Sequence, residues 1–253
     1  MEPMTIREIM DAVGGKLLGE FGDINRMVGR VETDSRTIHA GSLFVPLVGE
    51  RFDGHAYINA ALEGGAAGCF TQRERESYLP GKFYIKVDST QRALRDLAKY
   101  YKKKFPIPVV ALTGSVGKTT TKDMVAAVLG EKYRVLKTEG NLNNEIGVPM
   151  TLLRLSGEHE IAVLELGMNH AGEIDYLSAL VEPDVVLMTN IGDSHIEHFG
   201  SREKILEAKS EIFHHVKSGA FVVINGDDPL LNTLPGKLPY AFTRVGAGEG
   251  LDY

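Results

Sequence analysis

One run of residues constrains this chain more than any other: a short apolar stretch, then a glycine-bracketed turn, then Lys-Thr-Thr. The apolar residues Val109–Leu112 predict a short buried strand. The turn Thr113–Gly117 and the apolar helical spacing that follows Lys118 predict a loop that leads into a helix. In this layout, loop N–H groups and the helix N-terminus face an anion, and the lysine adds a point charge. The run therefore predicts a phosphate-binding loop.

The loop is shorter than the usual phosphate-binding pattern, which has a further glycine five residues before the Gly-Lys pair. Leu112 stands at that position here. The difference counts against an ordinary P-loop GTPase or kinase, which stays open as an alternative. A surface lysine after a glycine-rich turn is the simpler alternative, and it is disfavoured because the strand, loop and helix signals agree.

The composition argues against several classes of protein. A net charge of −6 over 253 residues argues against nucleic acid or an anionic membrane as the main partner. No apolar run approaches the length that spans a bilayer, and the residues up to Asp11 are not basic and then apolar, as a secretory signal would be. The single cysteine, Cys69, lies in a small apolar run and is interpreted as a buried thiol. We therefore expect a soluble, cytoplasmic protein with no nucleic-acid partner and no membrane insertion.

Two prolines within Phe105–Pro108 predict a short, stiff linker between two domains, 1–105 and 106–253. The first domain mixes short strands and helices, which predicts a small α/β unit. Its expected helices are 5–13, 54–62 and 90–103, and its expected strands are 16–18, 27–32, 42–47, 67–71 and 83–87.

Strands and helices alternate in the second domain, and its strands are almost continuously apolar. This pattern predicts a mainly parallel sheet with helices on both faces, so the fold class is α/β, with a P-loop-type nucleotide domain after the small first domain. The last residues, 246–253, are interpreted as a loop that begins a further strand, and we expect the intact chain to continue. The expected strands are 109–112, 134–136, 161–166, 185–188 and 220–224, and the expected helices are 118–129, 146–153, 172–180 and 202–216.

Three side chains are expected near the phosphate loop, since open α/β sheets bind ligands at the carboxyl ends of their strands. Glu165 lies near the end of an apolar strand, where a carboxylate is costly to bury unless it is paired or metal-bound. His195 follows the next strand and is either a structural histidine or a ligand. Lys209 falls on the inward stripe of its helix. It either packs its stem and extends its head to water, or binds substrate, or forms a carbamate that ligates a metal.

Two polar clusters complete the candidate site residues. Thr33–Arg36 comes directly after a predicted strand. The loop Gly140–Pro149 is rich in asparagine and precedes a predicted helix. Its asparagines either make turns and cap that helix, or direct amide groups at a terminal phosphate or at the substrate.

Together these motifs resemble the Mur ligase family of ATP-dependent amide-bond ligases, and the resemblance covers essentially all 253 residues. A short phosphate loop is a feature of that family, which accounts for Leu112. The motifs that carry the resemblance are Thr33–Arg36, Gly41–Val45, Phe52–His55, Thr113–Thr120, Gly140–Pro149, Glu165–Asn169, Ser194–Gly200, Ala208–Ile212 and Asn225–Pro229.

The resemblance implies ATP and Mg²⁺ as cofactors, with Lys118 on the β- and γ-phosphate oxygens. It implies that Thr119 and Glu165 hold the Mg²⁺ that bridges those phosphates and that His195 serves a second Mg²⁺. Lys209 matches a lysine that family members can carry as a metal-binding carbamate. The residues implied to bind ATP are Thr113, Gly114, Ser115, Val116, Gly117, Lys118, Thr119, Thr120, Asn144 and Asn225, with Asn225 near the adenine. Those implied to act in catalysis are Lys118, His195 and Lys209.

The resemblance also implies that the first domain binds a UDP-sugar through Ser35 and Arg36, with Asn141 as a further substrate contact. The implied reaction adds D-alanyl-D-alanine to UDP-N-acetylmuramoyl-tripeptide through an acyl phosphate, in peptidoglycan precursor synthesis. Family members have a third, C-terminal domain that closes over ATP, and this chain stops before it. We therefore expect these 253 residues by themselves to bind UDP-sugar and ATP without ligase activity. Another ligase of the family is the remaining alternative, beside the P-loop NTPase.

Overall fold

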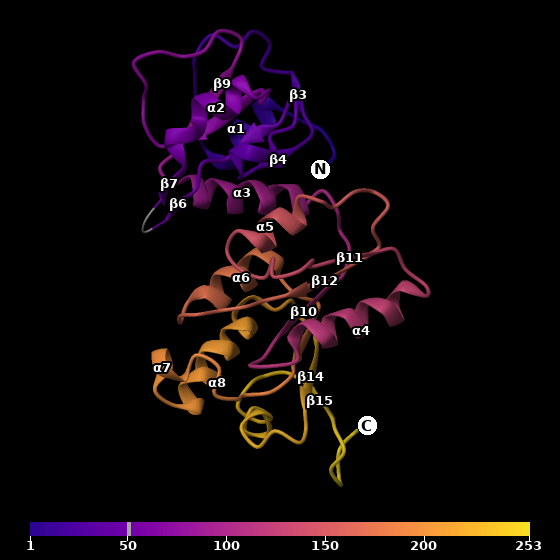
Figure 1. Cartoon of the computed structure of the whole chain (residues 1–253). Helices are drawn as coiled ribbons and strands as arrows, with labels where there is room; N and C mark the ends of the chain where they lie inside the picture. The colour runs from indigo at the N-terminus through magenta and orange to yellow at the C-terminus, as the bar shows by residue number, and fades with distance from the viewer. Residues whose placement is uncertain (50–51) are drawn as a thin grey trace. The chain divides into compact units, whose positions relative to one another are not determined.

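The chain forms two compact units in a computed structural model that describes residues 1–49 and 52–253 (Figure 1). The first unit comprises Met1–Phe105 together with Leu152–Ser156, and the second comprises Pro106–Thr151 together with Gly157–Tyr253. Each unit has its own sheet, as expected for an α/β protein with a small first domain. None of the helices in the described residues combines the length and the apolar character needed to cross a bilayer.

The first unit is built on a mixed five-stranded sheet with the strand order β2-β9-β8-β5-β4. Only the β2 edge is antiparallel to its neighbour. Every residue of β8 is buried, which explains why its sequence is apolar or small throughout. The strands of this sheet are β2 (Lys16–Leu18), β4 (Val31–Glu32), β5 (Leu43–Phe44), β8 (Gly68–Thr71) and β9 (Phe83–Lys86). Two small antiparallel pairs join β1 (Met4–Thr5) to β3 (Met27–Val28) and β6 (Val48–Gly49) to β7 (Phe52–Asp53).

Local sequence signals set the helices of the first unit. The first begins at a capping box, in which Thr5 and Glu8 satisfy each other's backbone N–H groups, and it ends at Gly14 with a φ of +59°. Ser89 caps the third, whose apolar stripe is buried. The helical elements are α1 (Ile6–Val13), the 3₁₀ turns η1 (Ser35–Thr37) and η2 (Gly54–Tyr57), α2 (Ile58–Glu63) and α3 (Thr90–Lys102).

The segment Leu152–Ser156 belongs to the first unit although the sequence around it belongs to the second. The hydroxyl of Tyr101, on α3, donates to the Leu155 carbonyl oxygen at 2.6 Å and accepts from the Glu2 N–H at 2.6 Å. Both Leu153 and Leu155 are buried. The fold of the first unit therefore uses residues that follow it by some fifty positions in the chain.

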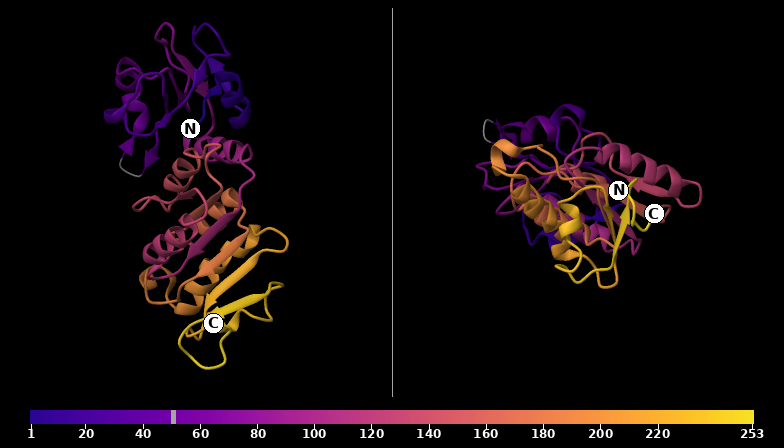
Figure 2. Two further views of the ribbon diagram at one scale, coloured as in Figure 1. Left: turned by 90° about the vertical axis from the view of Figure 1, so that its right-hand side faces the viewer. Right: turned by 90° about the horizontal axis from the view of Figure 1, so that it is seen from below.

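The second unit is a six-stranded sheet in which every pair is parallel, with the order β11-β12-β10-β13-β14-β15 (Figure 2). The predicted parallel α/β sheet is thus confirmed. All residues of β10 are buried, as its apolar run predicts. The strands are β10 (Val109–Thr113), β11 (Val135–Lys137), β12 (Ile161–Glu165), β13 (Val185–Met188), β14 (Phe221–Asn225) and β15 (Phe242–Val245).

Helices lie on both faces of this sheet (Figure 1). The chain moves one way along the sheet through α4, and the opposite way through α5, α6 and α8. Right-handed crossovers place helices of opposite direction on opposite faces, so α4 lies across from the other three. Because the strands are parallel, the carboxyl ends of β10, β12, β13 and β14 lie along one edge of the sheet. The helical elements are α4 (Lys118–Gly130), α5 (Gly147–Leu152), α6 (Glu173–Val181), α7 (Ile196–Phe199), α8 (Arg202–Ser210), η3 (Glu211–His215) and η4 (Leu231–Thr233).

The sequence-based assignment of elements is wrong in several places, including residues 246–253, which form no strand, and three further differences are informative. The strand predicted over 27–32 is two strands, β3 and β4, which belong to different sheets. The helix predicted over 202–216 ends at Ser210 and tightens into η3, because the Glu211 carboxylate accepts the Gly172 and Asp175 N–H groups at the start of α6. The edge strand β15 was not predicted, since its half-exposed residues include Thr243 and Arg244 and lack an apolar run.

The substitution Gly68→Ala tests the packing of β8 against β9. A Cβ atom at Gly68 would collide with the carbonyl oxygen and ring of Phe83. We expect the substitution to lower the free energy of unfolding by about 1–3 kcal/mol, because the two strands must move apart. Gly29→Ala is the matched control, since its Cβ would meet only Pro3 Cγ at 3.7 Å. Urea unfolding monitored by circular dichroism measures both, and equal midpoints would contradict this account.

Candidate functional site

The loop between β10 and α4 has a backbone that only glycine accommodates at two positions. Gly114 has a φ of +151°, and a Cβ there would collide with the Thr189 hydroxyl. Gly117 has a φ of +78° and forms the N-cap of α4. The N–H groups of Lys118, Thr119 and Thr120 find no acceptor in the described chain. Since a helix N-terminus with free N–H groups attracts anions, the loop has the properties of a phosphate cradle.

A second loop, Thr189–Ser194, holds the phosphate loop in place, and we call it the clamp loop. The Asn190 carbonyl oxygen accepts the Ser115 N–H at 2.9 Å, and its side-chain oxygen accepts the Val116 N–H at 3.0 Å. The Ser115 hydroxyl in turn accepts the Gly192 N–H at 2.8 Å. Two of the predicted phosphate ligands, Ser115 and Val116, therefore have their N–H groups committed to the clamp loop. The free donors of this loop are those at the start of α4.

Lys118 folds over the phosphate loop. Its ammonium group donates to the carbonyl oxygens of Gly114 at 2.9 Å and Ser115 at 3.4 Å. Burial lowers the pKa of Lys118, and the nearby Glu165 carboxylate opposes that shift. The Lys118 ammonium therefore lies against the phosphate loop, and the Glu165 carboxylate is near enough to favour its charged form.

Glu165 ends β12 with only 1% of its surface exposed. One carboxylate oxygen accepts the Thr119 hydroxyl at 2.9 Å, and the other accepts the Asn143 amide at 2.8 Å. Thr113, buried at the end of β10, donates from its hydroxyl to the Leu166 carbonyl oxygen at 2.9 Å. The predicted pair of Thr119 and Glu165 is therefore brought together. Sequence reasoning missed Asn143, although it named its neighbours in the same asparagine-rich loop.

The other asparagines have different surroundings. The Asn144 side-chain oxygen accepts the N–H groups of Ile146 at 3.2 Å and Gly147 at 2.8 Å, so it caps the start of α5. Asn141 is exposed at the tip of the loop. The capping interpretation of the loop thus describes Asn144, while Asn143 reaches the buried carboxylate.

Lys209 lies on α8 with 2% of its surface exposed, as the inward stripe predicts. No hydrogen bond or salt bridge joins its amine to any residue that the structure describes. Burial lowers the pKa of Lys209 to about 7, and the positive charge of Lys118 contributes to the shift. An amine with this pKa is largely neutral in weakly alkaline solution, which makes it nucleophilic.

His195 follows β13 at the same edge of the sheet and caps α7 with a φ of +66°, a strained backbone for a residue other than glycine. Its ring lies 6.5 Å from that of His198. It makes no hydrogen bond or salt bridge to Glu165 or Lys209, and the described residues hold no cluster of three or more His, Cys, Asp or Glu side chains suited to a metal. The structure therefore does not join His195 to the other predicted ligands.

A hollow of about 400 Å³ opens beside the phosphate loop, over β13, β14 and β15. Its walls are mainly apolar, with Asn225 and Thr121 as polar members. Apolar walls with a few polar groups suit a flat heterocycle. Asn225, predicted near the adenine, lines this hollow together with Thr121, Leu187, Met188, Thr189, Val223, Ile224 and Val245.

The first unit has a hollow of its own, of about 410 Å³. Ser35 and Arg36 line it, with the stacked rings of Phe52 and Tyr57, whose centroids are 5.6 Å apart. The Arg36 guanidinium pairs with Asp34 at 2.6 Å and lowers the pKa of that carboxyl to about 2. The hollow thus combines aromatic faces with an exposed cation.

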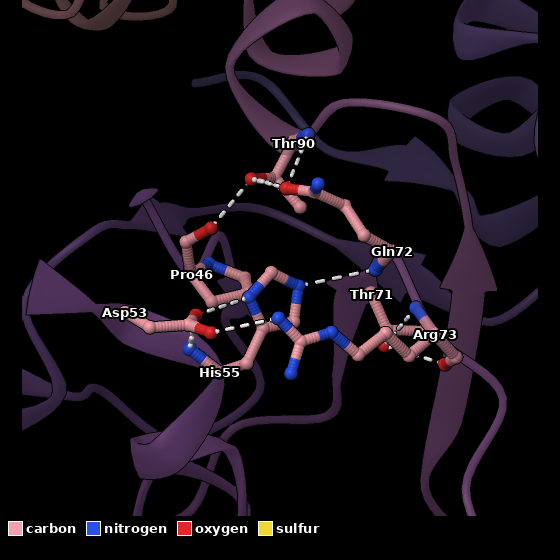
Figure 3. A network of polar contacts seen from close by, with 7 residues as sticks. All are labelled: Pro46, Asp53, His55, Thr71, Gln72, Arg73 and Thr90. Atoms are coloured by element: carbon pink, nitrogen blue, oxygen red, sulfur yellow. Dashed lines mark hydrogen bonds and ion pairs between the residues drawn. The ribbon is translucent and has the colours of Figure 1, made fainter. Parts of the chain in front are cut away.

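A polar network fixes the segment that carries those aromatic rings (Figure 3). His55 Nε2 accepts the Gln72 N–H at 3.1 Å, so its Nδ1 carries the proton and donates to Asp53 at 2.7 Å. Arg73 binds the second oxygen of Asp53 at 3.0 Å. Glycine is required at position 54, between Asp53 and His55, because a Cβ atom there would collide with the Leu47 backbone. The Phe52–His55 motif, in which Asp53 also caps the helical turn that begins at Gly54, is therefore structural support for the hollow.

The fold and the site define a class: an α/β protein with a phosphate loop at the carboxyl edge of a parallel sheet. Residues 112–250 match the model of the Mur ligase middle domain, and residues 28–102 match that of the Mur ligase family catalytic domain. The chain belongs to the Mur ligase family, and the resemblance found in its motifs is confirmed.

The similar proteins include several with one name. The chain is 46% identical over 227 residues to the UDP-N-acetylmuramoyl-tripeptide–D-alanyl-D-alanine ligase of Bacillus subtilis, covering 90% of this chain and 50% of that protein. The Escherichia coli protein of the same name is 42% identical over 228 residues, with 90% and 49% covered. The chain spans about half the length of the curated relatives it matches.

Solved structures of similar proteins also match this chain. MurF from Acinetobacter baumannii superposes with a TM-score of 0.90 at 36% identity, covering 100% of this chain and 55% of that one. The MurF ligase from Thermotoga maritima in complex with ADP gives 0.80 at 37% identity, covering 88% and 51%.

Lys209→Met should stabilise the protein in a pH-dependent way. The folded state disfavours the ammonium form, with a pKa of about 7 against 10.5 for an ordinary lysine. The cost is complete below pH 7 and disappears as the pH rises toward 10.5. We expect the substitution to raise the free energy of unfolding by about 1–3 kcal/mol at pH 7 and by less at pH 10. Urea unfolding at both values measures it, with the exposed Lys204→Met as control; a gain independent of pH would contradict the burial of the charge.

Proposed function

We propose that this protein takes part, in the cytoplasm, in the ATP-dependent addition of D-alanyl-D-alanine to UDP-N-acetylmuramoyl-tripeptide, a step of peptidoglycan precursor synthesis. One observation carries the proposal: Thr119, bonded to Glu165, lies in the first turn of α4 among free N–H groups, and the Lys118 ammonium contacts the phosphate loop. These groups together are suited to bind a nucleoside triphosphate. The names of the similar ligases supply the substrates.

ATP would bind with its phosphates on the loop Gly114–Thr120. The free N–H groups at the start of α4 and the Lys118 ammonium would contact the β- and γ-phosphate oxygens. Thr113, Ser115 and Val116 shape the loop rather than donate to the nucleotide. The adenine would lie in the hollow beside Asn225. The relative from Thermotoga maritima, which was solved with ADP, supports a nucleotide ligand.

The donor set suits Mg²⁺, which prefers oxygen ligands. Thr119 and Glu165 would hold the ion, and the Asn143 amide, bonded to the carboxylate, would help to keep Glu165 in place for it. His195 would serve a second ion. Lys209, neutral and close to the Lys118 charge, would add a ligand after it forms a carbamate with CO₂. When bound, the ion would help to neutralise the charge of the transferred phosphoryl group.

The sugar nucleotide would bind to the first unit. The hollow at Ser35 and Arg36 offers aromatic faces for a base and a guanidinium for a diphosphate. Asn141, exposed on the loop of the second unit, is an expected contact for the rest of the substrate. The terminal carboxylate of the tripeptide would attack the γ-phosphate and release ADP. The amine of D-alanyl-D-alanine would then attack the acyl phosphate and release phosphate, while Lys118 stabilises the charge that develops.

In the full-length protein, we expect Lys118→Ala to abolish ADP formation, because the developing phosphoryl charge loses the cation of the phosphate loop. Binding of the UDP-sugar should stay within about twofold of the unchanged protein, since Lys118 belongs to the other unit. A coupled ADP assay and calorimetric titration measure the two effects. Lys132→Ala, at an exposed site just past α4, is the control. Undiminished ADP release by Lys118→Ala would sink the assignment, and a preference for GTP would favour a GTPase.

A second candidate function is binding of both nucleotides without ligation, favoured because these residues span about half of each relative. We expect the 253-residue chain to bind a UDP-sugar and ADP in calorimetry. With UDP-N-acetylmuramoyl-tripeptide, D-alanyl-D-alanine, ATP and Mg²⁺, mass spectrometry should detect no ligated product. Turnover at the rate of a full-length relative would refute this candidate.

A further inference from the structure

Two acidic side chains are buried among the described residues, and the proposed chemistry uses only one of them. Glu165 belongs to the phosphate site. The other is Asp228, which follows β14 and has 8% of its surface exposed. A buried carboxylate needs hydrogen-bond donors to offset its lost hydration, so the donors that Asp228 recruits indicate its role.

Asp228 accepts three backbone N–H groups from two parts of the chain. One oxygen binds the N–H groups of Leu230 at 2.9 Å and Leu231 at 3.0 Å, in its own turn. The other oxygen binds the buried Ile191 N–H at 2.7 Å. Ile191 lies in the middle of the clamp loop, 37 residues earlier in the chain. The carboxylate therefore joins the end of β14 to the clamp loop.

Both neighbours of Ile191 reach the phosphate loop. Asn190 accepts the Ser115 and Val116 N–H groups, and Gly192 donates to the Ser115 hydroxyl. A continuous path of hydrogen bonds thus runs from Asp228 to the phosphate loop. Because each link uses backbone groups, a displacement at Ile191 moves the donors and acceptors that hold that loop.

The clamp loop has another side-chain anchor, and it is of a different kind. Arg202 binds Asp193 through two bonds of 2.6 and 2.7 Å, but both side chains are more than half exposed. Exposed ion pairs hold a loop weakly because water competes for the same groups. The Asp228–Ile191 bond is shielded from water, so it is the stronger restraint.

The same turn also supports the hollow beside the phosphate loop. The Asp228 N–H donates to the Asn225 carbonyl oxygen at 3.2 Å, and the Asp227 N–H donates to the Asn225 side-chain oxygen at 2.9 Å. Asn225 lines that hollow. One turn therefore connects to both places where the two ends of a nucleotide would bind.

We infer that Asp228 is a positioning residue for the nucleotide: its carboxylate keeps the phosphate loop and the hollow beside Asn225 in a fixed position relative to each other. This inference rests on the proposed nucleotide site. Asp228 itself reaches no reacting atom and acts through Ile191. Its removal should weaken nucleotide binding and loosen the phosphate loop while the fold of the sheet is kept.

Asp228→Asn tests this inference, because an amide keeps the size of the side chain but replaces one acceptor oxygen with a donor. The variant cannot accept both from Ile191 and from its own turn. We expect the dissociation constant for ADP to rise about tenfold in calorimetry with the 253-residue chain. We also expect amide hydrogen exchange at Ser115, Val116 and Gly192 to accelerate about tenfold without nucleotide, with exchange in β10 unchanged.

Asp227→Asn is the matched control. Asp227 is the adjacent acid, and its carboxylate accepts the Ala247 and Gly248 N–H groups at 2.7 and 2.9 Å, away from the clamp loop. We expect its ADP affinity and its exchange rates at Ser115 and Val116 to match those of the unchanged chain. Equal losses in both variants would overturn the inference, as would faster exchange spread evenly over β10 and β14.

Two measurements keep the test decisive. In the unchanged chain, the Ile191 amide should exchange as slowly as the amides of β14; free exchange there would overturn the inference without any variant. If the unchanged chain does not bind ADP, the proposed nucleotide site fails in this chain. The exchange rates at Ser115 and Val116 in Asp228→Asn then still decide whether Asp228 holds the phosphate loop.

Discussion

The second unit depends on one buried carboxylate. Glu165 is out of contact with water, so its charge is tolerable only if donors surround it. Thr119 and Asn143 supply them, and they come from α4 and from the loop before α5. Satisfying one charge thereby fixes β12, the start of α4 and the asparagine-rich loop relative to each other. The free N–H groups of the helix stay directed at the same place because the helix cannot turn without breaking the bond from Thr119.

Charge balance explains the rest of the site. Lys118 and Lys209 are both withdrawn from water, and the Lys118 charge helps to lower the pKa of Lys209, while the Glu165 carboxylate opposes the fall in the pKa of Lys118. A partly buried lysine next to unpaired N–H groups at a helix N-terminus favours an anion. The buried amine costs stability, which is a common property of sites whose groups are arranged for a ligand rather than for the fold.

Local patterns were sufficient for part of this picture. The apolar strand, the glycine turn and the helical spacing predicted β10, the phosphate loop and α4, and the inward stripe predicted that Lys209 is buried. Residues whose role depends on a distant partner escaped prediction. Asn143 and Asn144 are neighbours in the same loop, yet one binds Glu165 and the other caps α5. The strand β15 forms because it pairs with the exposed edge of β14, and no local run of apolar residues predicts it.

The short segment Leu152–Ser156 has a consequence for how the molecule is made. A ribosome completes the sheet of the first unit by Phe105, but the acceptor for the Tyr101 hydroxyl emerges only with Leu155. Between Phe105 and Leu155, the ribosome adds β10, α4 and β11, which belong to the other unit. The two units are thus interleaved in the order of translation, and a gene cut at the linker would leave the first without its last piece. Separate expression of the halves would therefore yield a first unit that lacks Leu152–Ser156 and a second that carries this segment without its partners.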